Sequence, residues 1–161
     1  MKAFHVIGRK DNGKTALVVD LIEELTSRGL KIGSIKHTPH THELDSPGKD
    51  SHKHRLAGAN PAAIIAKDLT ALFFSTDHEH DYYESLLDLF SDCDFVIIEG
   101  DIEAPRTKVE VWRQSCGTDP IALTRDDISA IVTDDPIAIN IPVWPRSNIK
   151  KIGDKILELT R

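Results

Sequence analysis

Blocks of apolar residues with different spacings follow one another along this chain and predict strands and helices in turn. Ala3–Ile7 is a short, mostly apolar run that ends at Gly8, as a buried strand does. The block after it has apolar residues at helical spacing, and we expect a helix from about residue 14 to residue 28, with Gly29 as its C-terminal stop. Leu30–Lys36 alternates and predicts a second strand.

The remainder of the chain continues this pattern. The further expected elements are a short helix around Ser51–Gly58 capped by Asp50 or Ser51, strands at Ala62–Ala66 and Thr70–Phe74, a helix from Asp77 through Phe90, strands at Phe95–Ile98, Lys108–Arg113, Ala130–Thr133 and Pro142–Trp144, and a closing helix at Ser147–Leu159. We interpret Lys108–Arg113 as an edge strand because its polar and apolar residues alternate strongly. This order predicts an α/β three-layer fold with a mainly parallel sheet and a small β-hairpin insertion, in one domain over residues 1–161.

Residues 8–15 fit the phosphate-binding pattern G-x-x-x-x-G-K-[ST], between a predicted strand and a predicted helix start. In such a loop, backbone N–H groups and the N-terminus of the helix surround the phosphates. Lys14 would reach the β- and γ-phosphates, and the Thr15 hydroxyl would hold Mg²⁺. The pattern therefore predicts a P-loop NTPase fold that binds a nucleotide. The candidate binding residues are Gly8, Arg9, Lys10, Asp11, Asn12, Gly13, Lys14, Thr15, Ala16, Lys36, His37 and Lys49.

A carboxylate follows another predicted strand, because Glu99 comes directly after Phe95–Ile98. Ligands of open α/β sheets bind beyond the carboxyl ends of the strands. We therefore expect Glu99, the loop after Lys36 and the phosphate loop to meet at one sheet edge. Glu99 and Lys14 are the candidate catalytic residues, and the candidate Mg²⁺ ligands are Thr15, Glu99 and Asp50.

Residues 36–55 hold five of the eight histidines, together with several basic residues. His40 and His42, or His52 and His54, alternate as metal ligands sometimes do, although neither pair has a spacing diagnostic of zinc. A nickel-type metallochaperone is therefore one alternative. We favour an anion-binding role for this loop, since Lys and Arg bind phosphate through charge-assisted hydrogen bonds.

Composition limits the class of protein. A net charge of −6 argues against a general nucleic-acid binder. Cys93 and Cys116 are isolated and lack metal-type spacing, so we expect free thiols. The first strand begins almost at once, which leaves no room for a signal peptide, and no apolar run approaches the roughly 20 residues that cross a bilayer. We expect a cytoplasmic protein without a membrane span.

Several segments in the same order resemble one family. These segments are the phosphate loop, Ile35-Lys36-His37-Thr38, Asp45-x-Pro47-Gly48-Lys49-Asp50-Ser51, Arg55-x-Ala57-Gly58-Ala59, Val96-Ile97-Ile98-Glu99-Gly100 and Lys108-Val109-Glu110-Val111. Together they are similar to the MobB family of molybdopterin-guanine dinucleotide biosynthesis adapters. The resemblance implies a homodimeric GTP-binding protein with weak GTPase activity, which assists the guanylyltransferase that attaches GMP to molybdopterin.

Several positions differ from what the family commonly has. Small residues are usual inside the phosphate loop, where this chain has Arg9, Lys10 and Asp11. A second Thr often follows the Mg²⁺ residue and an aromatic residue often follows Glu-Gly, whereas this chain has Ala16 and Asp101 at those positions. These differences motivate a second alternative, an adapter that binds nucleotide without useful hydrolysis. For an additional arginine on the phosphates, Arg9 and Arg55 are the candidates within the chain.

Overall fold

The structure is a computed structural model that describes residues 2–75 and 83–159. The chain divides into two compact units, and we describe each by itself. Unit 1 consists of residues 1–38 and 88–161, and unit 2 is Pro39–Leu87. None of the helices within the described ranges is both long and apolar enough to cross a membrane.

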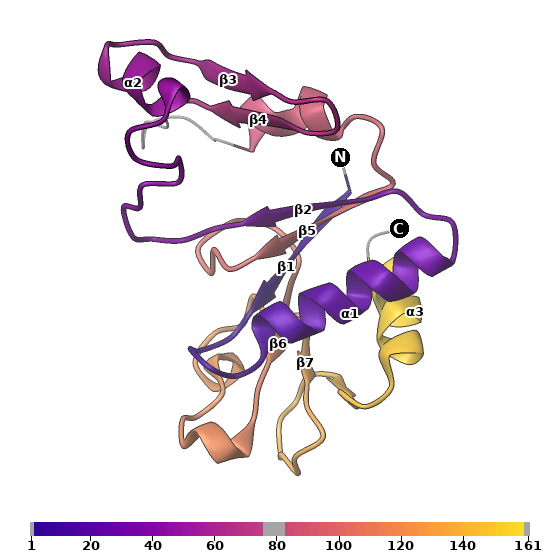
Figure 1. Ribbon diagram of the computed structural model, residues 1–161. Helices are drawn as coiled ribbons and strands as arrows, with labels where there is room; N and C mark the ends of the chain where they lie inside the picture. Colours follow the sequence, from indigo (N-terminus) through magenta and orange to yellow (C-terminus); the bar gives the residue numbers. More distant parts are fainter. Residues whose placement is uncertain (1, 76–82, 160–161) are drawn as a thin grey trace. The chain divides into compact units, whose positions relative to one another are not determined.

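Unit 1 is built on a six-stranded sheet in the order β2-β5-β1-β6-β7-β8, and every pairing within it is parallel (Figure 1). The strands of this sheet are β1 (Ala3–Ile7), β2 (Ile32–Lys36), β5 (Phe95–Glu99), β6 (Lys108–Val111), β7 (Ala130–Val132) and β8 (Val143–Trp144). The helices of unit 1 are α1 (Lys14–Ser27), α3 (Ile149–Leu159) and the 3₁₀ turns η2 (Gln114–Cys116) and η3 (Ile121–Leu123). The expected α/β class with a mainly parallel sheet is confirmed.

One prediction about this sheet is wrong. The segment that we interpreted as an edge strand, Lys108–Arg113, forms β6 in the interior of the sheet, between β1 and β7. Its alternation is real, but all four residues of β6 are buried, including Lys108 and Glu110. The polar residues of β6 therefore face a closed interior and not solvent.

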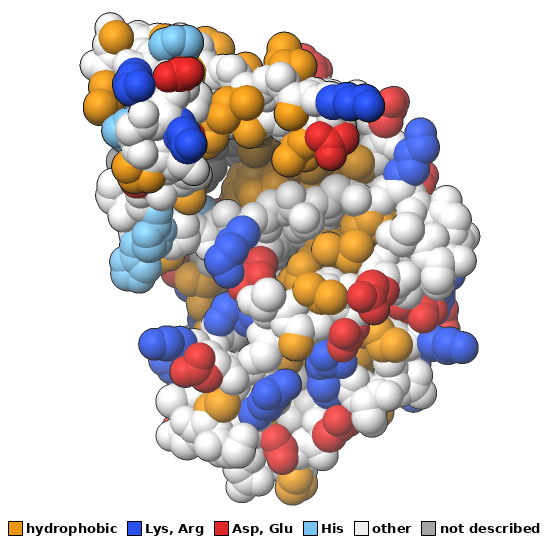
Figure 2. Space-filling model, in the orientation of Figure 1, with side chains coloured by type: hydrophobic (Ala, Val, Ile, Leu, Met, Phe, Trp, Pro, Cys, Tyr) orange, Lys and Arg blue, Asp and Glu red, His pale blue; other side chains and the backbone are white. Residues whose placement is uncertain are grey.

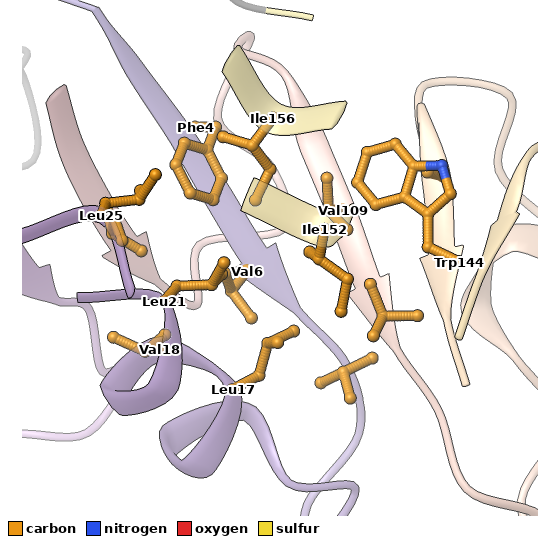
Figure 3. Close-up of a cluster of buried hydrophobic side chains, with 14 residues drawn as sticks. Phe4, Val6, Leu17, Val18, Leu21, Leu25, Val109, Trp144, Ile152 and Ile156 are labelled. Carbon is orange, nitrogen blue, oxygen red and sulfur yellow. The ribbon is translucent and has the colours of Figure 1, made fainter. Parts of the chain in front are cut away.

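The first face of the sheet is packed by α1 and α3, whose side chains meet those of β1, β6 and β7 (Figure 3). Since side chains alternate along a strand, Phe4 and Val6 share this face. Leu21 from α1 and Ile152 from α3 are fully buried against it. This face of unit 1 is a hydrocarbon core, and we call it the apolar face.

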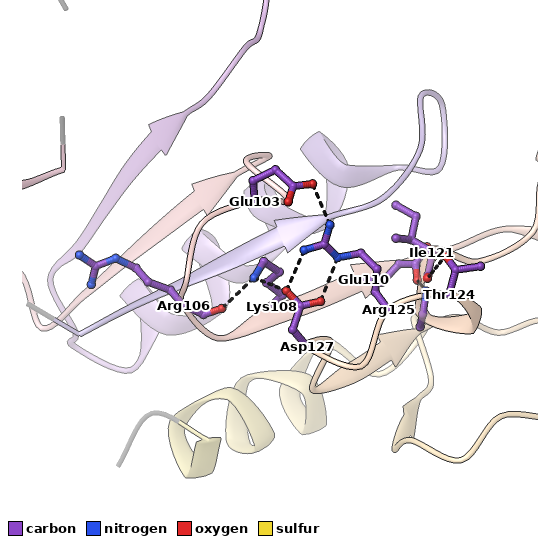
Figure 4. A network of polar contacts seen from close by, with 9 residues as sticks. Glu103, Arg106, Lys108, Glu110, Ile121, Thr124, Arg125 and Asp127 are labelled. Atoms are coloured by element: carbon purple, nitrogen blue, oxygen red, sulfur yellow. Dashed lines mark hydrogen bonds and ion pairs between the residues drawn. The ribbon is translucent and has the colours of Figure 1, made fainter. Parts of the chain in front are cut away.

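The second face carries buried polar residues. His5, Lys108 and Glu110 alternate with the residues of the apolar face, and each is at most 2% exposed. The register pairs His5 with Lys108. The segment from residue 101 to residue 107 and the segment from residue 113 to residue 128 supply the partners of Lys108 and Glu110 (Figure 4). We call this side of the sheet the polar face.

Each buried ionisable group on the polar face has a defined partner. The Lys108 ammonium donates to the Asp127 carboxylate over 2.8 Å, and Arg125 donates to the same carboxylate. Glu110 accepts from the backbone N–H groups of Ile121 and Ala122, both over 2.8 Å. Burial raises the pKa of Glu110 and these two hydrogen bonds oppose the shift. The polar face thus uses strand side chains to fix the loops that cover it.

His5 is a hydrogen-bonded histidine of the core. Its Nδ1 lies 2.9 Å from the Gly100 carbonyl oxygen, and its ring is fully buried. Burial lowers the pKa of His5, while the contact with Gly100 opposes that shift. A neutral ring is therefore favoured at this position.

Unit 2 contains α2 (Asp50–Leu56) and the predicted hairpin of β3 (Ala62–Ile65) with β4 (Thr70–Phe73), which is antiparallel. The N-cap of α2 is Lys49 and not Asp50 or Ser51, and Asp50 lies in the first turn, where its charge favours the helix dipole. Apolar side chains stay exposed over the hairpin, which Figure 2 shows in orange.

The predicted helix from Asp77 through Phe90 begins outside the described residues. Its described end is the 3₁₀ helix η1 (Glu84–Phe90) and not an α-helix. The other strands and the closing helix match their predicted positions to within two or three residues.

Candidate nucleotide site

Strand register brings the key polar groups of unit 1 to one place. Glu99 is paired with Val6 of β1 on one side and with Lys36 of β2 on the other. Two residues after Val6, the chain enters the phosphate loop at Gly8. The expected meeting of Glu99, Lys36 and the loop is therefore a direct result of parallel pairing.

The two glycines of the phosphate loop occupy positions where a side chain has no room. A Cβ on Gly8 would lie 2.4 Å from the Val111 carbonyl oxygen. Gly13 has φ +91°, in the left-handed region that favours glycine. It caps α1, and among the described residues no side chain bonds the helix start and no acidic residue lies in the first turn. The first N–H groups of α1 and the positive end of its dipole are thus available to an anion.

Lys14 and Thr15 lie at this helix start. The Lys14 ammonium donates to the Arg9 carbonyl oxygen over 2.9 Å, so it bends back across the loop. Partial burial lowers the pKa of Lys14, and the nearby charge of Glu99 opposes this shift. The Thr15 hydroxyl donates to Glu99 Oε1 over 2.9 Å.

Glu99 is the centre of this arrangement. Its Oε1 accepts both from Thr15 and from the Lys36 ammonium, which lies 2.7 Å away. The Glu99 side chain is 9% exposed and that of Lys36 is 66% exposed. Hydroxyl and carboxylate oxygens are ligands that Mg²⁺ prefers, so Thr15 and Glu99 fit a magnesium site by their chemistry.

Several residues inside the phosphate loop make contacts that stabilise its conformation. Asn12 is fully buried, and its amide donates to the Lys10 carbonyl while its Oδ1 accepts from the Arg113 N–H. Asp11 is exposed at φ +65°, and its carbonyl accepts from the Cys116 thiol. The Arg9 guanidinium donates to the Asp119 carbonyl. Lys10 and Ala16 are exposed.

These contacts define a supporting segment that sequence reasoning missed, residues 113–119, which we call the 113–119 loop. It follows β6 and contacts the phosphate loop at Arg9, Asp11, Asn12 and Gly13. The signal was present, because this loop leaves the carboxyl end of a strand at the same sheet edge. The incorrect interpretation of β6 as an edge strand kept the 113–119 loop from being predicted as part of the site.

The remaining predicted residues divide between the two units. The His37 N–H donates to the Glu99 carbonyl over 2.9 Å, so His37 belongs to the same edge of unit 1. Lys49 and Asp50 belong to unit 2, where Asp50 pairs with Lys53 at 3.3 Å and is 90% exposed. The structure thus brings Thr15 and Glu99 together, while the role of Asp50 stays a prediction.

Polar side chains around α2 in unit 2 form a local network. The Asp45 carboxylate is buried and accepts from the Ser46 N–H and the Ser51 hydroxyl. Arg55 donates to Glu43 over 2.7 Å. Within the described ranges, no group of three or more His, Cys, Asp or Glu side chains is placed to hold a metal ion. The metallochaperone alternative therefore gains no support from these residues.

Comparison with known sequences gives a consistent set of relatives. A family model described as MobB, molybdopterin guanine dinucleotide synthesis protein B, matches residues 3–134. A molybdopterin-guanine dinucleotide biosynthesis adapter protein of Escherichia coli (strain K12) is 30% identical over 151 residues, which cover 91% of this chain and 86% of the relative. An adapter protein of the same description from Haemophilus influenzae is 29% identical, with 94% and 85% covered.

Solved structures agree in fold. A crystal structure of molybdopterin-guanine biosynthesis protein B aligns with a TM-score of 0.76 at 23% identity, covering 98% of this chain and 99% of that one. The crystal structure of Bacillus subtilis MobB aligns with a TM-score of 0.75 at 22% identity, covering 100% and 99%. At these identities the likeness supports the fold alone. That fold consists of the parallel sheet in unit 1 and the small hairpin in unit 2.

Proposed function

The chain belongs to the MobB family of molybdopterin guanine dinucleotide synthesis proteins, and from that premise we propose that it is a GTP-binding adapter of molybdopterin-guanine dinucleotide biosynthesis. Its relatives carry that adapter description. In this proposal the whole chain acts in the cytoplasm as one functional domain. It assists the guanylyltransferase that joins GMP to molybdopterin.

The observation that carries the proposal is the arrangement around the phosphate loop. A helix start without a side-chain cap, a lysine across the loop and the Thr15–Glu99 contact lie at one sheet edge of unit 1. In the proposed complex, the loop N–H groups and Lys14 bind the phosphates. Thr15 and Glu99 hold Mg²⁺, with Lys36 and His37 as neighbouring contacts, while the roles of Asp50 and Lys49 stay predictions from the sequence. When bound, Mg²⁺ neutralises phosphate charge.

Slow GTP hydrolysis is part of the proposal. The residues of the site bind and orient the phosphates, which is the main protein contribution to phosphoryl transfer. Glu99 would orient water, but its Oε1 already accepts from Lys36 and Thr15. That contact favours the second candidate function, an adapter that binds GTP without useful turnover.

Calorimetric titration with GTP and GDP in the presence of Mg²⁺, beside a phosphate-release assay, tests both candidates. We expect Lys14→Ala to weaken GTP binding about 10- to 100-fold, since hydrogen bonds to charged groups contribute about 1.5–3 kcal/mol. Lys31→Ala is the matched control, because Lys31 is exposed just before β2, at the opposite end of that strand from Lys36. Unchanged binding in Lys14→Ala would contradict the proposal. Tight binding without phosphate release favours the non-hydrolysing adapter.

We also propose that the protein is a homodimer, as the family resemblance implies, and β6 offers no exposed edge for pairing because it lies inside the sheet. Ile65 and Leu69 of the hairpin in unit 2 are 82% and 70% exposed, which supports the hairpin as the self-association surface. Light scattering should give twice the chain mass, and Ile65→Lys should reduce it. Leu123→Lys, at an apolar position of η3 that is 53% exposed, is the control. A monomeric wild type removes this part of the proposal alone.

A further inference from the structure

An arginine side chain occupies the space that Gly13 leaves open in the phosphate loop. A Cβ built on Gly13 would lie 2.6 Å from Nη2 of Arg113 and 2.9 Å from its Cζ. Gly13 immediately precedes Lys14, the first residue of α1. The Arg113 guanidinium therefore lies directly against the start of the helix that the phosphate loop feeds.

The backbone of Arg113 is fixed by the phosphate loop itself. Its N–H donates to Oδ1 of the fully buried Asn12 over 2.7 Å. The next N–H, that of Gln114, donates to the Asp135 carboxylate over 2.8 Å. The indole of Trp112 donates to the Thr118 carbonyl and closes the 113–119 loop. Arg113 is thus held at a set position, although the residue as a whole is exposed.

The charge of Arg113 is unfavourable at this place unless an anion is present. The N-terminus of a helix carries partial positive charge, and cations there destabilise it. Lys14 already brings one positive charge to the start of α1. None of the ion pairs found among the described residues involves Arg113. Two cations at the positive end of a helix form an arrangement that a phosphate group stabilises.

The two arginines suggested from the sequence are engaged elsewhere. The guanidinium of Arg9 donates to the Asp119 carbonyl oxygen. Arg55 pairs with Glu43 in unit 2. Arg113 is the arginine of unit 1 whose guanidinium lies against Gly13.

We propose that Arg113 is a phosphate contact of the bound nucleotide, a second cation that the chain supplies beside Lys14. The inference rests on the proposed binding of GTP. A planar guanidinium can donate two parallel hydrogen bonds to phosphate oxygens, which an ammonium cannot do. Arg113 then contributes binding energy and orients the phosphate chain.

Isothermal titration with GTP and with GDP, in Mg²⁺ buffer at two salt concentrations, tests this assignment. We expect Arg113→Gln to bind both nucleotides about 10- to 100-fold more weakly. Its affinity should also depend less steeply on salt, since one screened charge contact is gone. Arg113→Lys should fall between wild type and Arg113→Gln because it keeps the charge and loses the planar geometry.

Lys150→Gln is the charge-matched control. Lys150 is exposed on α3, and its carbonyl accepts from Arg28, the residue that ends α1. It therefore lies at the other end of α1, about 20 Å from the phosphate loop along a helix of this length. Lys150→Gln should bind GTP as wild type does.

Melting of the nucleotide-free proteins separates ligand contact from structural support. Without nucleotide, we expect the melting temperature of Arg113→Gln to be no lower than that of wild type. Added GTP should raise the melting temperature of Arg113→Gln less than that of wild type. A lower melting temperature with unchanged affinity would overturn the inference. Affinity of Arg113→Gln within about twofold of wild type, while Lys14→Ala loses binding, overturns the inference and leaves the proposed function intact. If wild type binds neither GTP nor GDP, both fail.

Discussion

The two faces of the sheet in unit 1 solve the same burial problem with opposite chemistry. On the apolar face, Leu21, Ile152 and their neighbours pack hydrocarbon against hydrocarbon, and two helices supply the cover. On the polar face, Lys108 and Glu110 are equally buried, and loops supply the cover. The first face holds the helices on the sheet, whereas the second fixes segments that have little regular structure.

This difference explains how the phosphate loop is supported. Packing of α1 against the apolar face positions the start of the helix that the loop feeds. The 113–119 loop contacts the same loop from the strand β6, and the segment that follows it is bonded to Glu110. Packing between apolar side chains tolerates small shifts in their positions. A hydrogen-bonded carboxylate, in contrast, fixes the orientation of the groups that donate to it. The site therefore takes its stability from one face and its alignment from the other.

The largest effect should come from opening a cavity on the apolar face. We expect Leu21→Ala to lower the free energy of unfolding by about 2–5 kcal/mol, as fully buried Leu→Ala changes do. Val19→Ala, at a position of α1 that is 46% exposed, is the matched control and should stay within about 0.5 kcal/mol of wild type. Urea denaturation measures both. A loss below about 1 kcal/mol in Leu21→Ala would mean that this face is not the main source of stability.

A smaller effect should come from unpairing a charge on the polar face. Asp127→Ala removes the partner of the Lys108 ammonium, whose side chain is 2% exposed, and should cost about 1–3 kcal/mol. Lys108→Met alone leaves Asp127 with Arg125. The double variant should recover most of the loss, because no buried ammonium is left unpaired. Strict additivity in this double-mutant cycle, followed by urea denaturation, would show that the two residues are not coupled.

The smallest effect is a pair of opposite pH dependences on the polar face. Hydrogen bonds from Arg125 and Lys108 lower the pKa of Asp127 below its ordinary value of 3.8. Such an acid stabilises the fold above its unfolded pKa, and the contribution is lost as pH falls. The difference in unfolding free energy between wild type and Asp127→Ala should therefore shrink from about pH 6 to about pH 3.

Glu110 should show the reverse sign. Burial raises its pKa above the ordinary 4.5, so ionisation disfavours the fold as pH rises from the unfolded pKa to the folded one. The stability of wild type relative to Glu110→Gln should fall across that window. Denaturation series for the two variants over the same buffers provide the measurement. If the two differences in unfolding free energy changed in the same direction with pH, the proposed contrast between Asp127 and Glu110 would be wrong.

The sequence predicts most of the fold and part of the site, for a physical reason. Ala3–Ile7 and Phe95–Ile98 are mostly apolar runs, the first of them directly before the phosphate-loop pattern, and local pattern is enough to identify them. The same alternation in Lys108–Val111 gave a wrong prediction, since spacing cannot distinguish a polar side chain in solvent from a buried one whose ion-pair partner lies 19 residues later in the sequence. Arg113 was missed for that reason, because its place depends on where β6 lies in the sheet.

The hydrogen bond from the His37 N–H to the Glu99 carbonyl has a mechanical consequence. Unit 1 ends its first stretch at Thr38, one residue later, and the chain passes into unit 2 at Pro39. One of the two covalent links between the units is therefore anchored to the strand residue whose side chain bonds Thr15. A ligand that changes the position of Glu99 would therefore act on the backbone one residue before the first stretch of unit 1 ends.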